Sequence, residues 1–165
     1  LQKWLEDLGK LNQKFDIVLT HGIAELLNLT TGKPISLPSN IQLISIPFVS
    51  QDEYDWVLAQ CDFNIVRGED SFIRAQLAGK PFIWHIYPQE DRAHEVKLAA
   101  FLDLYLETAS QELRLATIAA MTWAMPSEWM NALDTWSGHS KAWRTHILKK
   151  QEDGGLAARL LHFIA

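Results

Sequence analysis

The chain has 165 residues, of which 48% are hydrophobic and 21% are charged, and it carries a formal net charge of −5. This is the composition of an ordinary globular domain, and its longest apolar runs, such as residues 98–102, fall far short of the roughly 20 residues that a transmembrane helix needs. With one cysteine, no secretory pattern at its start and no basic block, we expect a cytoplasmic protein that binds neither membranes nor nucleic acid.

Four short apolar runs in the first half predict β-strands, because they contain β-branched or aromatic residues and are bounded by turn residues. The predicted strands are residues 15–20, 41–46, 62–66 and 82–86. Helical patterns separate them, and the predicted helices cover 1–11, 23–29, a segment after Ser50 and a segment that opens within 67–71 and continues to 78. Ser50 and Glu53 have the spacing of a capping box, and Gly79 is typical of a helix C-terminus.

Neighbouring parallel strands need long connections, and the helical stretches of about ten residues between the predicted strands suit them. We therefore predict an α/β fold in which residues 1–90 form a Rossmann-like core with a doubly wound parallel sheet. After Pro88 the β-branched runs disappear and helical patterns take over. The predicted helices are 93–106, 111–123, 127–136, 139–150 and 156–164. We expect residues 91–165 to form a helical continuation that packs on the same single domain.

Open parallel sheets bind ligands beyond the carboxyl ends of their strands, where helix N-termini present free N–H groups. The end of the third predicted strand is the densest in polar groups, since Arg67, Gly68, Glu69, Asp70 and Ser71 follow one another there. A guanidinium, a hydroxyl and a helix start together suit a diphosphate. Asp and Ser are also the commonest helix caps, so ordinary capping is the alternative. Arg67 must either pair with a neighbouring carboxylate or meet an anion, and both possibilities stay open.

The second predicted strand is followed by Phe48 and Gln51, an aromatic ring that could stack on a nucleobase and an amide that could hydrogen-bond to it. The alternative is a core aromatic residue and a polar residue at a helix start. His85, Tyr87 and His94 do not have metal-ligand spacing, so no metal site is predicted. Neither the glycine-rich motif of dinucleotide-binding folds nor a P-loop occurs.

Three stretches of this half belong to one recognisable pattern. They read Ile-Pro-Phe-Val-Ser-Gln-Asp-Glu-Tyr-Asp at 46–55, Cys-Asp-Phe-Asn-Ile-Val-Arg-Gly-Glu-Asp-Ser-Phe-Ile-Arg-Ala-Gln at 61–76, and Ala-Gly-Lys-Pro-Phe-Ile-Trp-His-Ile-Tyr-Pro-Gln at 78–89. The pattern closely resembles the EarP family, the protein-arginine rhamnosyltransferases that modify elongation factor P. The resemblance implies a two-lobed GT-B enzyme, of which this chain would be the C-terminal lobe.

The resemblance also implies roles for individual residues in binding the donor, dTDP-β-L-rhamnose. The implied site residues are Phe48, Gln51, Arg67, Glu69, Asp70 and Ser71. Phe48 and Gln51 would recognise the thymine, and Arg67 and Ser71 would bind the diphosphate. Glu69 and Asp70 would lie near the ribose, the sugar or the acceptor arginine. Residues 19–22 depart from the family pattern, so we leave that loop out of the predicted site.

The implied reaction is an inverting transfer, in which negative charge builds on the leaving diphosphate. Without a metal or other cofactor, Arg67 and helix N–H groups would have to stabilise that charge. The acceptor guanidinium is protonated and a poor nucleophile, and Glu69 is the candidate for orienting it. The resemblance assigns the catalytic base, an aspartate, to the N-terminal lobe.

The chain begins with Leu1 rather than Met, and we expect it to be part of a longer protein. We therefore expect donor binding without turnover. One alternative is the nucleotide-binding lobe of another GT-B enzyme, such as a UDP-sugar transferase or a 2-epimerase. Another is a non-catalytic domain that binds a protein partner through exposed tryptophans of its helical half.

Overall fold

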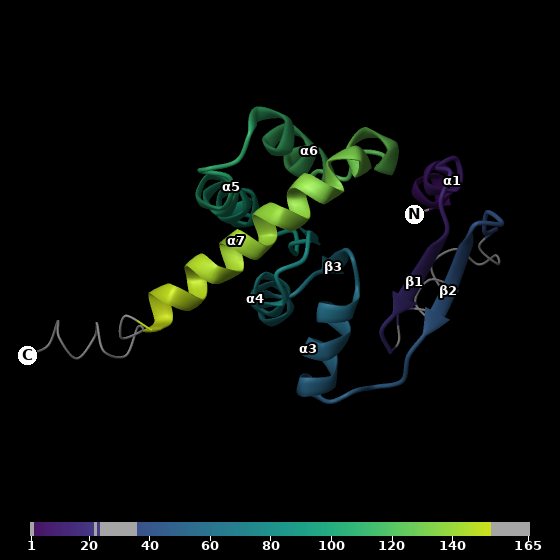
Figure 1. Ribbon diagram of the computed structural model, residues 1–165, viewed down its shortest axis with the longest axis horizontal. Helices are drawn as coiled ribbons and strands as arrows, with labels where there is room; N and C mark the ends of the chain where they lie inside the picture. The colour runs from purple at the N-terminus through teal and green to yellow at the C-terminus, as the bar shows by residue number, and fades with distance from the viewer. Residues whose placement is uncertain (1, 22, 24–35, 153–165) are drawn as a thin grey trace, which may run out of the picture.

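The structure, a computed structural model, describes residues 2–21, 23 and 36–152 (Figure 1). In chain order its elements are α1 (Gln2–Gly9), β1 (Phe15–Leu19), β2 (Ile41–Ser45), α3 (Gln51–Gln60), β3 (Asn64–Val66), α4 (Glu69–Ala78), β4 (Phe82–Trp84), α5 (Ala93–Tyr105), α6 (Gln111–Met121), the 3₁₀ turns η1 (Pro126–Glu128) and η2 (Met130–Ala132), and α7 (Leu133–Glu152). The predicted helix at 156–164 and all but the first residue of the one at 23–29 lie outside the described residues.

The first two strands pair in parallel, as their spacing predicts, with Phe15 opposite Ile41 and Leu19 opposite Ser45. Helix α1 packs an apolar face at the amino end of this pair. The side chains of Leu5 and Leu8 on α1 and Ile41 on β2 form a small buried cluster there. The helical spacing of leucines in the sequence therefore marks the face that packs on the sheet.

Strands β3 and β4 form a second parallel pair, with Asn64 opposite Phe82 and Val66 opposite Trp84. Each has three residues, fewer than the sequence predicts, and β4 is buried along its whole length. Helix α4 connects the two strands and packs against both. It ends as predicted at Gly79, whose φ of 68° lies in the left-handed region that favours glycine.

The parallel pairing of neighbouring strands is confirmed, but the single continuous sheet is not what the structure shows. The described strands form two separate two-stranded sheets, β1–β2 and β3–β4, which lie apart in Figure 1. Each sheet is supported by its own apolar cluster. Hydrophobic patterns along a chain reveal which runs are strands, but they do not specify which strand edges are joined by hydrogen bonds.

The second half is helical, with boundaries close to the predicted ones for α5 and α6. The predicted helices at 127–136 and 139–150 are wrong as separate elements. Residues 126–132 form η1 and η2, and α7 then runs without interruption through Gly138. A glycine weakens a helix by only about 1 kcal/mol, and Trp136 and Ser140, buried on either side of it, hold this turn in place.

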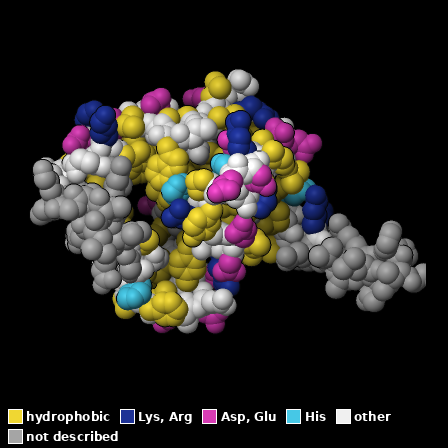
Figure 2. All heavy atoms as spheres, turned by 180° about the vertical axis from the view of Figure 1, so that it is seen from behind, with side chains coloured by type: hydrophobic (Ala, Val, Ile, Leu, Met, Phe, Trp, Pro, Cys, Tyr) yellow, Lys and Arg dark blue, Asp and Glu magenta, His cyan; other side chains and the backbone are white. Residues whose placement is uncertain are grey.

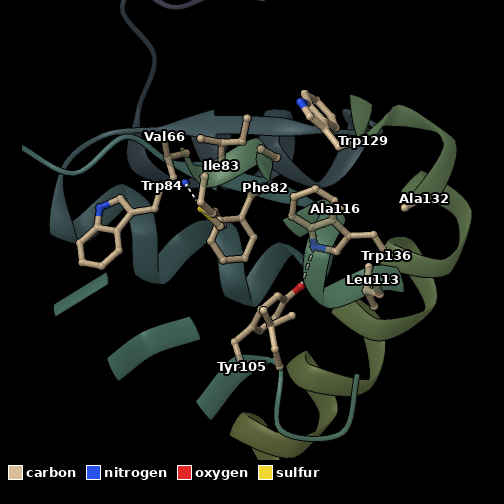
Figure 3. Packing of buried hydrophobic residues seen from close by; sticks show 14 of the residues in the cluster. Val66, Phe82, Ile83, Trp84, Tyr105, Leu113, Ala116, Trp129, Ala132 and Trp136 are labelled. Carbon is tan, nitrogen blue, oxygen red and sulfur yellow. Dashed lines mark hydrogen bonds between the residues drawn. The ribbon is translucent and has the colours of Figure 1, made fainter. Parts of the chain in front are cut away.

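The main core lies between the β3–β4 sheet and the C-terminal helices, and aromatic side chains dominate it (Figure 3). The indole Nε1 of Trp136 donates to the hydroxyl of Tyr105 at 3.0 Å, and that hydroxyl lies 2.8 Å from the Ser140 hydroxyl. The ring of Trp129 is 2% exposed and that of Trp136 fully buried. The indole N–H groups of both tryptophans thus have acceptors inside the core, Ala124 O for Trp129 and the Tyr105 hydroxyl for Trp136.

Candidate functional site

The carboxyl ends of the strands carry the polar and aromatic side chains of the predicted site. Phe48 and Gln51 follow β2, Arg67 follows β3, and Tyr87 lies three residues beyond the end of β4. Because β3 and β4 are parallel, their ends meet at one edge of the small sheet. This edge is where open α/β folds bind their ligands.

Arg67 is exposed and stacks on an aromatic ring rather than pairing with a carboxylate. The central carbon of its guanidinium lies 4.2 Å from the centroid of the Tyr87 ring, a cation–π geometry. None of the ion pairs among the described residues includes Arg67. Its backbone carbonyl accepts a hydrogen bond of 2.9 Å from the indole Nε1 of buried Trp84. The backbone of Arg67 is thus held by the core, while its guanidinium is exposed and can bind an anion.

The start of α4 is not capped by a side chain, contrary to the capping alternative. The N-cap residue is Gly68, which has no side chain to offer, and no side-chain hydrogen bond replaces one. Ser71 is half-buried in the first turn, and Glu69 is exposed. A first helical turn that lacks a cap presents its N–H groups and the positive end of the helix dipole to whatever lies in front of it.

Asp70, the other predicted cap, is part of an ionic cluster between two helices. Nε of Arg74 donates to a carboxylate oxygen of Asp70 at 2.8 Å. Nη1 of Arg74 lies 2.9 and 2.8 Å from the two carboxylate oxygens of Asp55 on α3. We call Asp55, Asp70 and Arg74 the Arg74 cluster. It raises the pKa of Arg74, chiefly through the hydrogen bond to Asp55 and then that to Asp70.

Phe48 is 84% exposed, so it is not the core aromatic residue of the alternative interpretation. Its nearest aromatic neighbour is His21 beyond β1, whose ring centroid is 6.4 Å away in an edge-on arrangement. Gln51 is also exposed and is the first residue of α3. The predicted capping box is confirmed at this helix start, because the side chain of Ser50 accepts from the Glu53 N–H and Glu53 bonds back to the Ser50 N–H.

The structure brings only some of the predicted residues together. Arg67, Glu69, Asp70 and Ser71 are grouped at the start of α4 by their sequence. Phe48 and Gln51 lie on a different segment, and the hydrogen bonds and ion pairs of the described residues connect that segment to α4 through the Arg74 cluster. The site therefore consists of two parts, one at the start of α3 and one at the start of α4.

The predicted site missed two aromatic groups that the structure places beside it. The sequence pattern brings Tyr87 in only through a metal-site interpretation, and its partner Arg67 lies 20 positions earlier, a separation that no local pattern detects. His21 belongs to the loop that was left out, yet its ring lies beside Phe48. Both contacts join residues that follow different strands, so predicting them requires knowing which strand ends are neighbours.

His85 lies between Arg67 and a tryptophan of the helical half. Its ring meets Trp123 edge-on, with centroids 4.9 Å apart. Burial lowers the pKa of His85, and the charge of Arg67 lowers it further. His94 is occupied elsewhere, since its Nδ1 accepts from the Gln89 N–H at 3.0 Å. Among the described residues no group of three or more His, Cys, Asp and Glu is placed to hold a metal ion.

Other surface features lie away from this edge. A shallow hollow around residues 9–14, Ser39 and Asn40 sits at the amino ends of β1 and β2. Figure 2 shows hydrophobic side chains exposed among charged ones on the face opposite that of Figure 1. Trp56 on α3 is 65% exposed, whereas Trp129 and Trp136 are buried. The helical half thus keeps two of the tryptophans that the protein-interaction alternative would use inside its core.

Within the described ranges, no helix is long and apolar enough to cross a membrane.

Comparison with known proteins places these features in a family. A family model described as the elongation factor P (EF-P) rhamnosyltransferase EarP matches residues 1–165. The chain is 35% identical to the protein-arginine rhamnosyltransferase of Pseudomonas aeruginosa over 179 aligned positions, which cover 100% of the chain and 47% of that protein. It is 34% identical to the enzyme of the same name from Pseudomonas putida, covering 99% of the chain and 46% of the relative. The chain thus spans about half the length of these curated relatives.

A solved structure also resembles this one. It is described as the structural basis for EarP-mediated arginine glycosylation of translation elongation factor EF-P. The two superpose with a TM-score of 0.77 at 31% sequence identity, over 99% of this chain and 56% of that one. The mixed α/β fold with short parallel strands is therefore that of a known EarP structure. This chain belongs to the EarP family of elongation factor P rhamnosyltransferases.

Proposed function

We propose that this chain is the donor-binding lobe of a GT-B rhamnosyltransferase, which holds dTDP-β-L-rhamnose for inverting transfer to an arginine side chain of elongation factor P. The observation that supports the proposal is the exposed guanidinium beside a helix start at the edge of the β3–β4 sheet. There Arg67 is stacked on Tyr87 and forms no ion pair with any carboxylate of the described residues, and it lies beside a helix start that lacks a side-chain cap. An acceptor that takes part in translation places the enzyme in the cytoplasm.

The proposed diphosphate site consists of Arg67, Ser71 and the first N–H groups of α4. A departing nucleoside diphosphate gains negative charge as the bond to the sugar breaks, and fixed donors aimed at that charge lower the barrier. The cation–π contact restricts the guanidinium before the donor arrives, so less side-chain freedom is lost on binding. This chemistry requires no metal.

The proposed base site consists of Phe48 and Gln51. A ring that is 84% exposed at a strand end offers a flat apolar surface on which thymine can stack. The amide of Gln51, at the start of α3, can both donate and accept a hydrogen bond at the edge of the base. Such hydrogen bonds would distinguish thymine from other bases.

Glu69 and Asp70 are proposed to line the sugar and acceptor side. Glu69 is exposed at the first position of α4 and forms no hydrogen bond or ion pair among the described residues, so its carboxylate is available to orient an incoming guanidinium. The catalytic base is proposed to be an aspartate of the N-terminal lobe, outside these 165 residues.

Calorimetric titration with dTDP tests the donor site. We expect saturable binding to the wild-type chain, weaker binding of UDP, and a loss of about 1.5 to 3 kcal/mol in Arg67→Ala, the range for a charge-assisted hydrogen bond. Arg144→Ala is the matched control, because Arg144 lies at the opposite end of α4, against Gly79. Equal affinity of the two variants for dTDP would contradict the proposed site, and a preference for UDP would favour a different GT-B enzyme.

The chain by itself should bind the donor without transferring rhamnose. A missing general base typically costs a factor of about 100 to 10,000 in rate, and the acceptor surface of the other lobe is missing as well. Incubation with elongation factor P and dTDP-β-L-rhamnose, followed by intact-mass spectrometry, checks this. Modification of the acceptor at the rate of a full-length relative would show that the base lies in this half.

A further inference from the structure

We infer that Arg74 is a positioning residue of the donor site, which holds the base-binding and diphosphate-binding parts at a fixed spacing by clamping α3 to α4. The inference rests on the proposed function, because it assigns the two helix starts to the two ends of one nucleotide. Arg74 is assigned no direct contact with the nucleotide and acts through Asp55 and Asp70.

The geometry of the Arg74 cluster is that of a clamp rather than of a single surface pair. One nitrogen, Nη1, lies within 2.9 Å of both oxygens of Asp55, and Nε bonds Asp70 at 2.8 Å. The arginine side chain is 19% exposed although both carboxylates are more open. Isolated surface ion pairs contribute little, but a planar guanidinium shared by two carboxylates fixes both distance and direction.

Asp55 lies one helical turn from a proposed ligand-binding residue, and Asp70 is itself proposed to line the sugar side of the site. Asp55 follows Gln51 by four positions, so both side chains lie on the same face of α3. Asp70 precedes Ser71 in the first turn of α4. A shift of either helix would therefore move one end of the nucleotide site relative to the other.

Charge excludes Arg74 from direct diphosphate binding. Two carboxylates surround one guanidinium, so the Arg74 cluster carries a net negative charge and would repel a phosphate. Arg67 at the adjacent strand end has no such partner among the described residues. The two arginines thus have different tasks, with Arg67 free for the ligand and Arg74 committed to the scaffold.

The clamp adds to the connection that runs through the short strand between the two helices. Between α3 and α4 the chain passes through β3, which has three residues and pairs with a strand of equal length. Such a short ladder offers few hydrogen bonds to resist a relative movement of the helices. The Arg74 cluster adds three charge-assisted contacts at the end where the ligand is proposed to bind.

The test compares dTDP affinity in variants that break the clamp from either side. Arg74→Gln and Asp55→Asn should each weaken dTDP binding about five- to tenfold, and the double variant should be no weaker than the singles, because one unit is being removed. Arg74→Lys should bind almost as weakly as Arg74→Gln, since an ammonium group lacks the planar fork. Asp55→Glu should recover part of the affinity.

Asp52→Asn is the matched control, since it removes the same charge from the first turn of the same helix and Asp52 forms no ion pair among the described residues. Its dTDP affinity should equal that of the wild type. Thermal unfolding without ligand separates positioning from stability. A lowered midpoint in Asp55→Asn with unchanged dTDP affinity would overturn the inference.

Two further outcomes decide whether Arg74 acts as a clamp. If Asp55→Asn binds dTDP more tightly while Arg74→Gln binds it more weakly, Arg74 touches the diphosphate directly and the clamp is refuted. If the wild-type chain does not bind dTDP, the proposed function fails, and the clamp is judged by hydrogen exchange alone. Equal protection of the hydrogen-bonded amides beyond the first turns of α3 and α4 in Asp55→Asn and Asp52→Asn would then overturn it.

Discussion

At the scale of single residues, the edge of the β3–β4 sheet combines an exposed positive charge with an imidazole whose pKa is lowered. Arg67 is anchored by its carbonyl to Trp84 and by its guanidinium to Tyr87. His85 is half-buried next to it and against Trp123. Burial and the neighbouring cation both disfavour imidazolium.

His85 should make stability depend on pH in the range just below neutrality. Its pKa is lowered in the folded chain, mainly by burial, so the unfolded chain takes up a proton near the ordinary value of about 6.5 while the folded chain does not. Stability should therefore fall as pH decreases below about 6.5. Urea unfolding of the wild type and of His85→Gln between pH 7.5 and pH 5.5 measures this, with His146→Gln, at an exposed position of α7, as the control.

The His85→Gln variant should show a flatter dependence of the unfolding free energy on pH than the other two proteins. An identical slope in all three would mean that His85 is not protonated differently in the folded and unfolded states.

The sequence suffices to place Arg67, Ser71, Phe48 and Gln51 at strand ends, because strands and caps are local patterns. It does not suffice to show whether Arg67 is free. Its ring partner Tyr87 belongs to the next strand end, and the carboxylate of Asp70 is occupied by Arg74. Which polar groups pair with each other is decided by packing between helices, for which no pattern along one helix provides information.

At the scale of elements, two glycines in the helices should respond to the same substitution with opposite signs. Gly79 adopts a φ of 68°, and an added Cβ would lie 2.8 Å from Cδ of Arg144. Gly79→Ala should cost about 1 to 2 kcal/mol for the left-handed conformation. Gly138 lies inside α7 with no heavy atom within 4 Å of an added Cβ. Gly138→Ala should stabilise by about 0.5 to 1 kcal/mol.

Both glycine variants are compared with the wild type by chemical denaturation, and each serves as the control for the other. If the two changed stability in the same direction, backbone conformation and helix propensity would not be the causes. Circular dichroism at a fixed temperature should show equal helix content in all three proteins, because neither substitution removes a helix.

Helix boundaries, too, can be predicted where they depend on neighbouring residues and not where they depend on residues distant in sequence. The capping box at Ser50 and the C-terminus at Gly79 were predictable because they depend on neighbouring residues. The uninterrupted α7 was not, because Trp136 and Ser140 are buried by partners distant in sequence. For the same reason the division of the strands into two sheets was not predictable from periodicity.

At the scale of the whole molecule, α1 joins the β1–β2 sheet to the main core. Trp4 packs against both apolar clusters, with ring centroids 6.2 Å from Trp129 and 6.3 Å from Trp123. Asp7, which is buried, accepts a hydrogen bond of 2.8 Å from the Ser127 N–H at the start of η1. The first helix of the chain is thus a structural part of its second half.

Asp7→Ala should destabilise the whole chain by about 1.5 to 3 kcal/mol, the range for a hydrogen bond to a charged group. The Ser127 N–H lowers the pKa of Asp7, with a smaller part from Lys10. The contribution of Asp7 to folding stability is therefore fully present above the pKa of about 3.9 that Asp has in the unfolded chain, and it is lost as the pH falls through the lower pKa of the folded chain. Urea unfolding at pH 7 measures it against Glu6→Ala, an exposed acidic residue of the same helix.

A stability of Asp7→Ala equal to that of Glu6→Ala would mean that α1 is held by its apolar face alone. Loss of signal in two steps, rather than one, would show that the β1–β2 sheet and the main core can unfold separately once this contact is removed.

The contact between Asp7 and Ser127 also implies an order of events during folding. Strand partners lie 26 residues apart in the first sheet and 18 in the second, as the pairs Phe15–Ile41 and Asn64–Phe82 show. The two contacting residues of α1 and η1 are 120 positions apart. Closing the longer loop costs more chain entropy. The contact of the N-terminal helix with η1 should therefore form last, and removing the Asp7 carboxylate should speed unfolding while leaving the refolding rate unchanged.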